Sequence, residues 1–136
     1  MPVVVVDTVD QLNALHGLGN ASLGISVSRE YVGRKFPELM PKLQFMAKGV
    51  TGGIAATRPD HRFIYYIVTK LAEDDKATYL SVYNALQALL MHVTINNVTE
   101  IIISPVGSDS LRFCKVKSFV EGLFADTEVR VHLCKF

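Results

Sequence analysis

Two short segments of the chain are apolar at every position, and both consist of β-branched residues. Val3 to Val6 is a run of valines, and Ile101 to Ile103 is a run of isoleucines. A strand that buries one face alternates apolar and polar residues, so an unbroken apolar run predicts a strand covered on both faces. Such strands occur mainly in sheets with helices on either side. The two runs therefore predict an α/β fold.

A long helix is predicted between these strands, from Thr78 to Asn96, because its apolar residues recur at the spacing of one helix face. A second apolar stripe predicts a helix over about 116–124. Ser28 suits the N-cap of a helix that runs through Phe36, and Pro37 can open a further helical stretch to about Met46. The stripe of the long helix comprises Tyr79, Val82, Tyr83, Leu86, Leu89, Leu90 and Val93.

The remaining predicted elements are strands. Segments 54–58 and 63–70 form a hairpin around Pro59-Asp60-His61, which is typical of a turn. Residues 128–134 alternate as a half-buried strand does. Strands and helices in this order predict a three-layer α/β/α domain with a mixed central sheet, spanning residues 1–136 as a single domain.

The segment after the first strand allows two interpretations. Asp7 or Thr8 can cap a short helix through Leu18, and Leu12 to Leu15 can equally form a strand. Gly17 to Gly24 is predicted to be a glycine-rich loop. Ligands of such sheets bind beyond the carboxyl ends of the strands. The loops of interest are therefore 17–24, 69–77 and 104–110.

The charge of the chain disfavours several classes of function. Among 136 residues, 14 are Lys or Arg and 13 are Asp or Glu, so the formal net charge is +1. A general nucleic-acid or membrane-surface binder needs a basic surplus, which this chain lacks. No apolar run reaches the roughly 18 residues of a membrane span. With no targeting segment visible, we expect the cytoplasm or the nucleus.

The sequence offers no evident metal site or disulfide framework. Cys114 and Cys134 are too few for such a framework, and we expect both to be buried thiols. The histidines are far apart and lack the spacing of metal ligands. We therefore expect neither a metal nor a cofactor. The histidines are His16, His61, His92 and His132.

Six segments of the chain together match a known pattern. They are Phe63-Ile64-Tyr65-Tyr66-Ile67-Val68-Thr69-Lys70, Lys76-Ala77-Thr78-Tyr79, Asn97-Val98-Thr99-Glu100, Gly24-Ile25-Ser26-Val27, Gly33-Arg34-Lys35-Phe36 and Phe124-Ala125-Asp126-Thr127-Glu128-Val129. These segments resemble the macro domain family, and most of all its terminal ADP-ribose protein glycohydrolases, also known as O-acyl-ADP-ribose deacylases. The likeness runs from about Leu12 to Phe136 and is densest between Phe63 and Glu100.

The resemblance implies a crevice for ADP-ribose, in which two loops wrap the diphosphate and the distal ribose. Backbone N–H groups near glycines and helix N-termini would bind the phosphates. Lys70 matches the position of the family's nucleophile, which attacks the anomeric carbon of the distal ribose after losing its proton. Asp7 is the candidate for the acid that meets adenine. The candidate ligand-binding residues are Asp7, Ser22, Leu23, Gly24, Ile25, Val106, Gly107, Ser108, Ser110 and Leu111.

The chain departs from the family pattern in both loops. The first loop usually reads Gly-Ala-Gly-Ile, where this chain has Ser22-Leu23-Gly24-Ile25. The last loop usually reads Gly-x-Gly-Leu-Asp, and Leu111 stands where the catalytic aspartate is expected. Asp109 takes over that role only if the loop is re-routed, and a carboxylate beside a diphosphate would repel it.

Two functions follow as hypotheses. The first is an enzyme that binds ADP-ribose and removes it from acidic side chains of modified proteins, or deacylates O-acyl-ADP-ribose, with Lys70 as nucleophile and Asp109 as its partner. The second is a catalytically inactive domain that reads ADP-ribose or serves as an interaction module. The retained Thr69-Lys70 pair favours the enzyme, and the altered last loop favours the reader. Single-stranded nucleic-acid binding is a third possibility, which the near-zero net charge does not favour.

Overall fold

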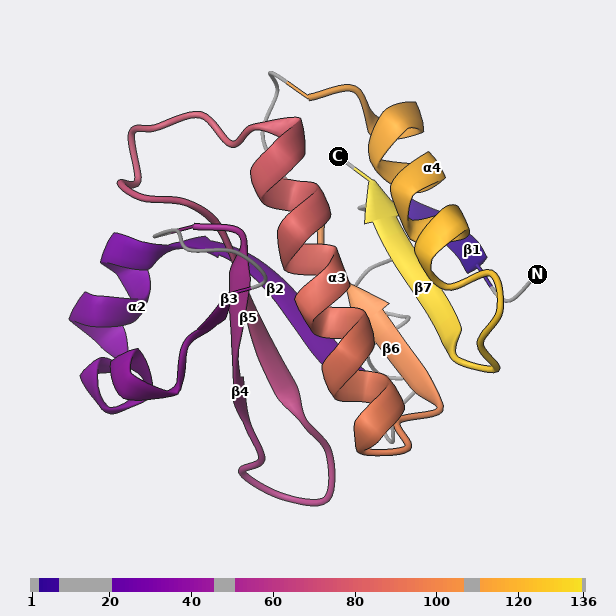
Figure 1. Ribbon diagram of the computed structural model, residues 1–136, viewed down its shortest axis with the longest axis horizontal. Coiled ribbons are helices and arrows are strands. Elements are labelled where there is room, and N and C mark those ends of the chain that lie inside the picture. Colours follow the sequence, from indigo (N-terminus) through magenta and orange to yellow (C-terminus); the bar gives the residue numbers. More distant parts are fainter. Residues whose placement is uncertain (1–2, 8–20, 46–50, 107–110, 136) are drawn as a thin grey trace.

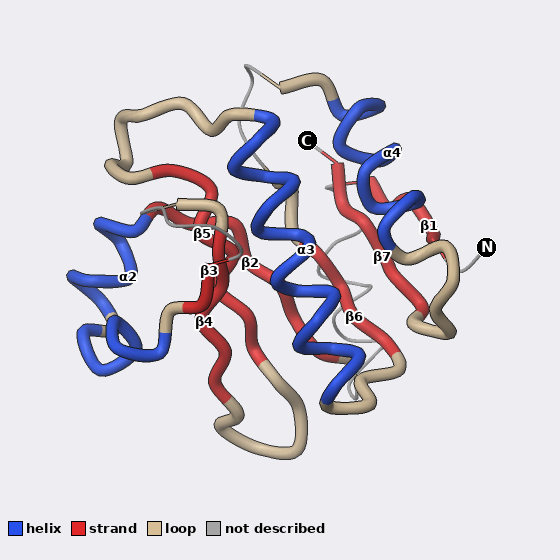
Figure 2. The backbone as a smooth tube through the Cα atoms, in the orientation of Figure 1, coloured by secondary structure: helices blue, strands red, loops and turns tan. Residues whose placement is uncertain are grey.

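The computed structural model describes residues 3–7, 21–45, 51–106 and 111–135. These residues form one sheet with helices on both faces (Figures 1 and 2). In chain order the elements are β1 (Val3–Asp7), β2 (Ser22–Ser28), α2 (Arg29–Lys35), the 3₁₀ helix η2 (Pro37–Lys42), β3 (Gln44–Phe45), β4 (Gly53–Thr57), β5 (Ile64–Lys70), α3 (Tyr79–Ile95), β6 (Glu100–Ile103), α4 (Phe113–Leu123) and β7 (Arg130–Lys135).

The sheet is mixed, as predicted, and β2 lies at its centre. The strand order is β1-β7-β6-β2-β5-β4-β3. From β1 to β5 every neighbouring pair is parallel, and the β5–β4 and β4–β3 pairs are antiparallel. The predicted hairpin is therefore confirmed as β4 and β5. The carboxyl ends of β2, β5, β6 and β7 all reach the same edge of the sheet, which we call the carboxyl edge.

Strand β5 shows why the sequence has unbroken apolar runs. Tyr65 and Ile67 point into the main core, which α3 and α4 cover. Tyr66 and Val68 point to the other face and pack against Val32 of α2. Both faces of the strand are buried, so neither can be polar. The predicted three-layer arrangement is confirmed.

The predicted long helix is confirmed as α3, and side chains cap its first turn. Thr78 is the N-cap, and its hydroxyl oxygen accepts a hydrogen bond from the Ser81 amide at 3.1 Å. In return the Thr78 amide donates to Ser81 Oγ at 3.2 Å, which completes a capping box. The helix ends before Asn97, which adopts the left-handed conformation with φ 55°.

The predicted helix over 37–46 is wrong in type and length. The structure has a 3₁₀ helix over Pro37–Lys42, followed by the short edge strand β3. Pro41 lies inside this segment and has no N–H to donate to the carbonyl four residues earlier. A continuous α-helix is therefore disfavoured at that point.

The prediction of a loop over 17–24 is wrong for Ser22 to Gly24, which belong to strand β2. Gly24 pairs with Tyr65 on one side and Ile103 on the other. A Cβ at Gly24 would lie 3.1 Å from Cδ1 of Ile67. The glycine suits the close packing of the core against its backbone, and it does not form a turn. The two interpretations of residues 8–18, with the rest of the glycine-rich segment, lie outside the described residues.

The two cysteines differ in exposure. Cys134 is buried, as expected, in a small apolar cluster with Ala21 and Ile102. Cys114 is exposed, so the expectation of a buried thiol is wrong there. It occupies the second position of α4, whose core-facing residues are Val116 and Val120. Among the helices described, none has both the length and the apolar character needed to cross a membrane.

A polar pair lies at the edge of the main core, formed by the buried Tyr65 and the half-buried His92. The Tyr65 hydroxyl lies 2.9 Å from Nδ1 of His92, which packs edge-on against the rings of Phe63 and Tyr65. Burial raises the pKa of Tyr65 and lowers the pKa of His92. The tyrosine therefore keeps its proton and the imidazole stays neutral, so the contact joins two uncharged groups.

The lowered pKa of His92 predicts a loss of stability in acid. Below pH 6.5, the ordinary histidine pKa, the unfolded chain takes up a proton that the folded chain does not. The free energy of unfolding should therefore fall as the pH drops through this range, and level off below the pKa of the folded state. Urea denaturation at a series of pH values measures this slope.

The His92→Phe variant should lose this contribution to the slope. At neutral pH it should cost about 1–3 kcal/mol, because the Tyr65 hydroxyl is left buried without a partner. The double variant Tyr65→Phe/His92→Phe is the control and should recover most of that cost. Identical pH slopes for the parent and His92→Phe would refute the role given to the imidazole.

Candidate functional site

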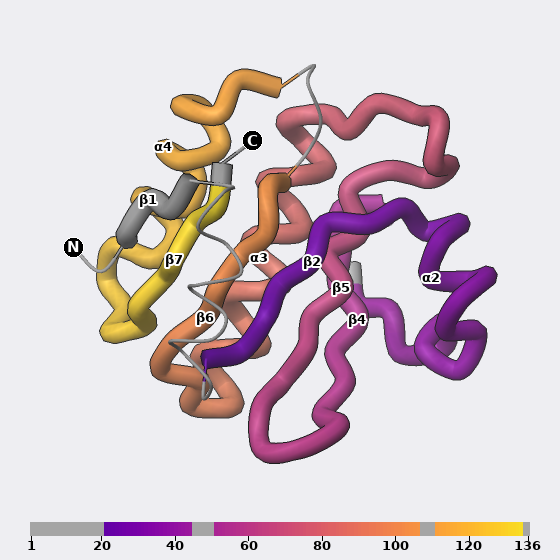
Figure 3. Tube along the Cα trace, turned by 180° about the vertical axis from the view of Figure 1, so that it is seen from behind, coloured from indigo at the N-terminus to yellow at the C-terminus, as the bar shows by residue number. Residues whose placement is uncertain are grey.

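The carboxyl edge brings together the segments that follow β2, β5 and β6. Strand β2 continues into α2, β5 leads through residues 71–78 to α3, and the segment after β6 leads to α4 (Figures 1 and 3). Ser28, the last residue of β2, lies in register with Lys70, the last residue of β5. The lysine predicted as nucleophile thus lies beside the N-terminus of α2.

Hydroxyl groups join the three strands at this edge. The Ser26 amide donates to Oγ of Ser104 at 3.1 Å, and the two hydroxyls of Ser26 and Thr69 lie 3.1 Å apart. The Ser104 amide in turn donates to the Gly24 carbonyl at 2.8 Å. Thr69 is buried, whereas Ser26 and Ser104 are half-buried. This cluster, which we call the hydroxyl cluster, fixes the ends of β2, β5 and β6 relative to one another.

Lys70 lies at the mouth of a cavity on the α3 side of this edge. Its Nζ donates to the Glu73 carbonyl at 2.7 Å, and its side chain is half-buried. The cavity measures about 310 Å³, near the lower end of the roughly 300–1,000 Å³ typical of small-molecule sites. Its lining is mostly polar: Thr51, Thr69, Lys70, Leu71, Asp75, Lys76, Thr78 and Ser81.

Ser81 holds one wall of the cavity in place. Its hydroxyl donates to the Thr69 carbonyl at 2.6 Å while it accepts from the Thr78 amide. The first turn of α3 is thereby attached to the end of β5, immediately before Lys70. The position of the lysine backbone depends on this attachment.

The residues after Lys70 are also held by hydrogen bonds. The Asp75 carboxylate accepts from the Ala72 amide at 2.9 Å, and the Asp75 amide donates to the Ala72 carbonyl at 3.1 Å. Arg34 of α2 forms an ion pair with Glu73. The carbonyl that receives the Lys70 ammonium thus belongs to an ordered turn attached to α2.

The structure overturns the prediction that a first loop at Ser22 to Ile25 offers free amides to a diphosphate. These residues lie within β2 between two paired strands, and Ser22 and Leu23 lie at the end of the strand remote from Lys70. The Leu23 amide donates to the Phe63 carbonyl at 3.1 Å. A sheet ladder uses the N–H groups that a phosphate-binding loop would leave free.

No loop separates β2 from α2, and the first amides of the helix already have partners. The Tyr31 amide donates to Oγ of Ser28 at 3.0 Å, and the Glu30 amide donates to the Leu71 carbonyl at 2.9 Å. Ser28 is the N-cap of this helix, as predicted. The amides of Glu30 and Tyr31 are therefore not free to bind a ligand beside Lys70.

The structure describes only some of the other residues that were predicted to bind the ligand. Val106 is buried in the main core, and Leu111 is half-buried against it, so neither side chain faces the cavity beside Lys70. Ile25 is 37% exposed and does not line that cavity. Asp7 ends β1, the edge strand, away from β5. The segment 107–110, with Gly107, Ser108, Asp109 and Ser110, lies outside the described residues.

Sequence reasoning missed Ser26 and Ser81, and it included Thr69 and Ser104 only within segments of interest, without a role for their hydroxyls. Ser26 and Thr69 are polar residues late in a strand, and Ser104 directly follows the isoleucine run. Polar residues at the carboxyl ends of neighbouring parallel strands are the signal that would have found them. Within the described ranges, no three His, Cys, Asp or Glu side chains gather where a metal ion would fit.

Comparison with known proteins gives sequence relatives and structural neighbours. No family model matches the chain. The chain is 31% identical over 83 residues to the ADP-ribose glycohydrolase OARD1 of Bos taurus, and 30% identical to the Homo sapiens protein of the same name. Each alignment covers 60% of this chain and 55% of the relative, so the chain spans about half the length of the curated relatives it matches.

The structural neighbours share the fold at low identity. The macrodomain of Thermus aquaticus DarG matches with a TM-score of 0.72 and 16% identity, over 98% of this chain and 97% of that one. Thermosipho africanus DarTG in complex with ADP-ribose matches with a TM-score of 0.63 and 12% identity, over 86% of this chain and 38% of that one. The fold class expected from the sequence is thus confirmed.

Removing the Ser81 hydroxyl tests the attachment of α3 to β5. Ser81→Ala should lower the free energy of unfolding by about 1–3 kcal/mol, because a buried carbonyl and the capping box both lose a partner. Ser118→Ala is a matched control, since that exposed hydroxyl bonds only to a carbonyl within its own helix. It should change stability by less than about 0.5 kcal/mol. Urea denaturation of both variants checks this, and equal losses would refute it.

Proposed function

We propose, from the premise that the chain is a macro domain of the terminal ADP-ribose glycohydrolase type, that it binds ADP-ribose and hydrolyses ADP-ribosyl esters of acidic side chains. The observation that supports this most is Lys70 at the carboxyl end of β5, beside a cavity lined by hydroxyl groups. The curated relatives are named as ADP-ribose glycohydrolases. In this proposal residues 1–136 act as one domain.

The cavity beside Lys70 suits a sugar better than a flat aromatic base. Its lining is polar, and the Thr51 hydroxyl can both donate to and accept from a ribose hydroxyl. The hydroxyls of Thr78 and Ser81 are bonded to each other and to the backbone, and they form one wall of the cavity. The volume of about 310 Å³ is small for the whole of ADP-ribose. We therefore assign the distal ribose to this cavity, with the diphosphate extending along the carboxyl edge past the hydroxyl cluster.

In the proposed reaction the neutral amine of Lys70 attacks the anomeric carbon of the distal ribose. A C–N bond forms while the C–O bond to the substrate carboxylate breaks, and the bonding electrons leave with that carboxylate. The surplus proton on nitrogen passes to a base, for which Asp109 is the candidate. Water then adds to the same carbon and releases ADP-ribose, which regenerates the amine.

The Glu73 carbonyl gives Lys70 a defined starting position. A hydrogen bond of 2.7 Å holds Nζ toward the 71–76 turn. Attack requires Nζ to leave this partner as the substrate enters. The hydrogen bond thus positions Nζ before the substrate binds, and it has to break before Nζ can attack the substrate.

A second candidate is a reader that binds ADP-ribose without cleaving it. The direct passage from β2 to α2 favours this function, because the amides of Glu30 and Tyr31 are already used within the protein. A weaker hold on the diphosphate lowers the binding energy available for positioning the sugar. Recognition of ADP-ribose on a partner protein requires less accurate positioning than catalysis does.

Substitution of the lysine separates the two functions. On a glutamate-linked ADP-ribosyl protein, Lys70→Ala should lower the hydrolysis rate by more than about a hundredfold. Lys42→Ala is the control, because that exposed lysine lies on the 3₁₀ helix outside the cavity. It should keep the parent rate. If Lys70→Ala cleaves as fast as the parent, the lysine mechanism is wrong.

Calorimetric titration with ADP-ribose tests the binding site shared by both functions. The parent and Lys70→Ala should bind with dissociation constants within about tenfold of each other, because the lysine acts on the scissile bond more than on the diphosphate. Binding without hydrolysis by the parent would identify the reader. No detectable binding at millimolar ADP-ribose would exclude both functions.

A further inference from the structure

A tyrosine attaches the first turn of α3 to the start of α4. Tyr79 is the first residue of α3, and its hydroxyl oxygen accepts a hydrogen bond from the Arg112 amide at 2.9 Å. Arg112 is the N-cap of α4 and lies 33 residues later in the chain. Within the described residues, no side-chain hydrogen bond caps this end of α4. The bond that holds the start of α4 therefore comes from a neighbouring helix.

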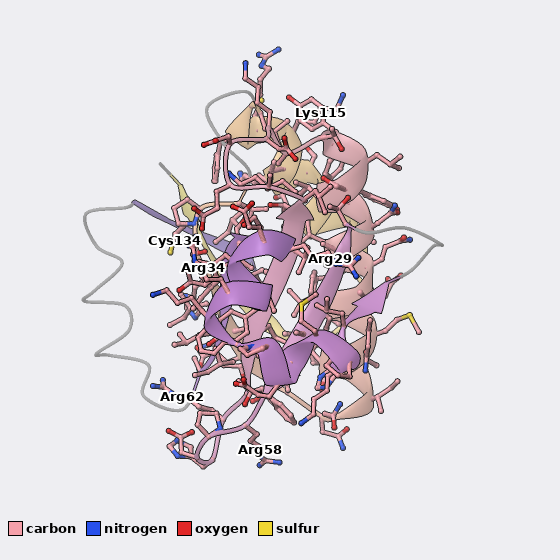
Figure 4. All side chains as sticks on the ribbon, turned by 90° about the vertical axis from the view of Figure 1, so that its left-hand side faces the viewer. Arg29, Arg34, Arg58, Arg62, Lys115 and Cys134 are labelled. Atoms are coloured by element: carbon pink, nitrogen blue, oxygen red, sulfur yellow. The ribbon has the colours of Figure 1, made fainter. Side chains whose placement is uncertain are left out.

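The ring of Tyr79 also packs against α4. Nζ of Lys115 lies 4.6 Å from the centre of this ring, and the ring of Phe119 meets it edge-on with 6.1 Å between the centres. Figure 4 shows Lys115 at the end of the molecule opposite Arg58 and Arg62, which belong to the segment between β4 and β5. The starts of α3 and α4 therefore lie together at the carboxyl edge (Figure 1).

The same turn of α3 is bonded to the end of β5. The Ser81 hydroxyl donates to the Thr69 carbonyl at 2.6 Å, and Lys70 is the next residue. Two hydroxyls of one turn, those of Tyr79 and Ser81, thus bind backbone groups of two separate segments. The distance between the start of α4 and the backbone of Lys70 depends on this turn.

The start of α4 limits where the candidate base of the proposed reaction can lie. Asp109 precedes Arg112 by three residues in the sequence, and three residues of extended chain reach at most about 11 Å. On the other side of Asp109, three residues before it, Val106 is buried in the main core. The range of positions open to the Asp109 carboxylate therefore depends on where Arg112 is held.

We propose that Tyr79 is a positioning residue for the hydrolysis, an inference that rests on the proposed function. Its hydroxyl holds the start of α4, and thereby the segment that carries Asp109, at a set distance from Lys70. The proton that leaves the Lys70 nitrogen passes to a base, and this transfer requires the two groups to be within hydrogen-bond reach. A displacement of about 1 Å can lower a rate about a hundredfold. Tyr79 acts through Arg112 and does not touch the substrate.

A role in packing alone would need the ring of Tyr79 but not its hydroxyl. Tyr83, one turn further along α3, shows the difference. Its ring also meets Phe119 edge-on, with 5.3 Å between the centres, and among the described residues its hydroxyl has no hydrogen-bond partner. The two tyrosines share a neighbour and differ in the bond to Arg112, so Tyr83 is a matched control for Tyr79.

Single-turnover hydrolysis of a glutamate-linked ADP-ribosyl protein, with the enzyme in excess, tests the proposal. Tyr79→Phe keeps the ring and removes the hydroxyl, and it should lower the rate about ten- to a hundredfold. Its dissociation constant for ADP-ribose should stay within about twofold of the parent value, because Asp109 acts during bond cleavage. Tyr83→Phe should keep both parent values. Circular dichroism at the assay temperature verifies that both variants are folded.

A double-mutant cycle tests whether Tyr79 acts through Asp109. In the Asp109→Asn background, Tyr79→Phe should lower the rate no further, because the group that it positions is gone. Effects of the two substitutions that multiply would overturn the proposal, and so would a parent rate in either single variant. If the parent does not hydrolyse the ester, the proposed function fails and the role of Tyr79 with it. If Lys70→Ala is inactive while Tyr79→Phe keeps the parent rate, only the role of Tyr79 is refuted.

Discussion

The parallel pairing of β2 with both β5 and β6 determines the rest of this structure. It brings the carboxyl ends of three strands to one edge, although Ser26, Thr69 and Ser104 are far apart in the sequence. Hydrogen bonds among these residues then hold the strand ends together. The close packing at this centre favours a residue without a side chain at position 24, because a Cβ there would lie 3.1 Å from Cδ1 of Ile67. The strands that end at the site are thus packed closely against each other in the middle of the sheet.

The parts of the fold that could be predicted were those in which apolar residues recur at a regular spacing in the sequence. The stripe of α3, the hairpin of β4 and β5, and the unbroken run of β6 each identify one element type, because burial on one or two faces imposes its own spacing. The structure at position 24 could not be predicted from such a spacing. A glycine before an isoleucine matches a phosphate-binding loop by residue type, and only the pairing with β5 and β6 on either side shows that the segment is a strand. Pro41 likewise changed the type of a helix that the apolar pattern alone did not distinguish. The role of Lys70 was predicted from the family resemblance. The hydroxyl groups around it could not be predicted, because they become neighbours only when the strands pair.

The direct connection between β2 and α2 changes how an anion can be held at this edge. A loop between a strand and a helix leaves several amides pointing outward, and these bind phosphates well. Here the helix begins immediately after Ser28, whose hydroxyl caps it, and the Glu30 amide is bonded to the segment after β5. The other polar side chains of the cavity beside Lys70 are threonine and serine hydroxyls together with Asp75 and Lys76. In the proposed complex the diphosphate therefore has no loop amides from β2 and α2, and the ribose is the part of the ligand that this cavity suits.

Helix α3 connects this site to the outer surface. Its inner side packs on the sheet, its first turn binds the Thr69 carbonyl through Ser81, and its outer side carries the apolar residues that begin with Leu80. Leu80 and Ser81 are adjacent in the chain, so the exposed apolar side of the helix and the wall of the cavity share one helical turn. A change that displaces this turn acts on the end of β5 through the hydrogen bond between Ser81 and the Thr69 carbonyl, and so on the backbone of Lys70.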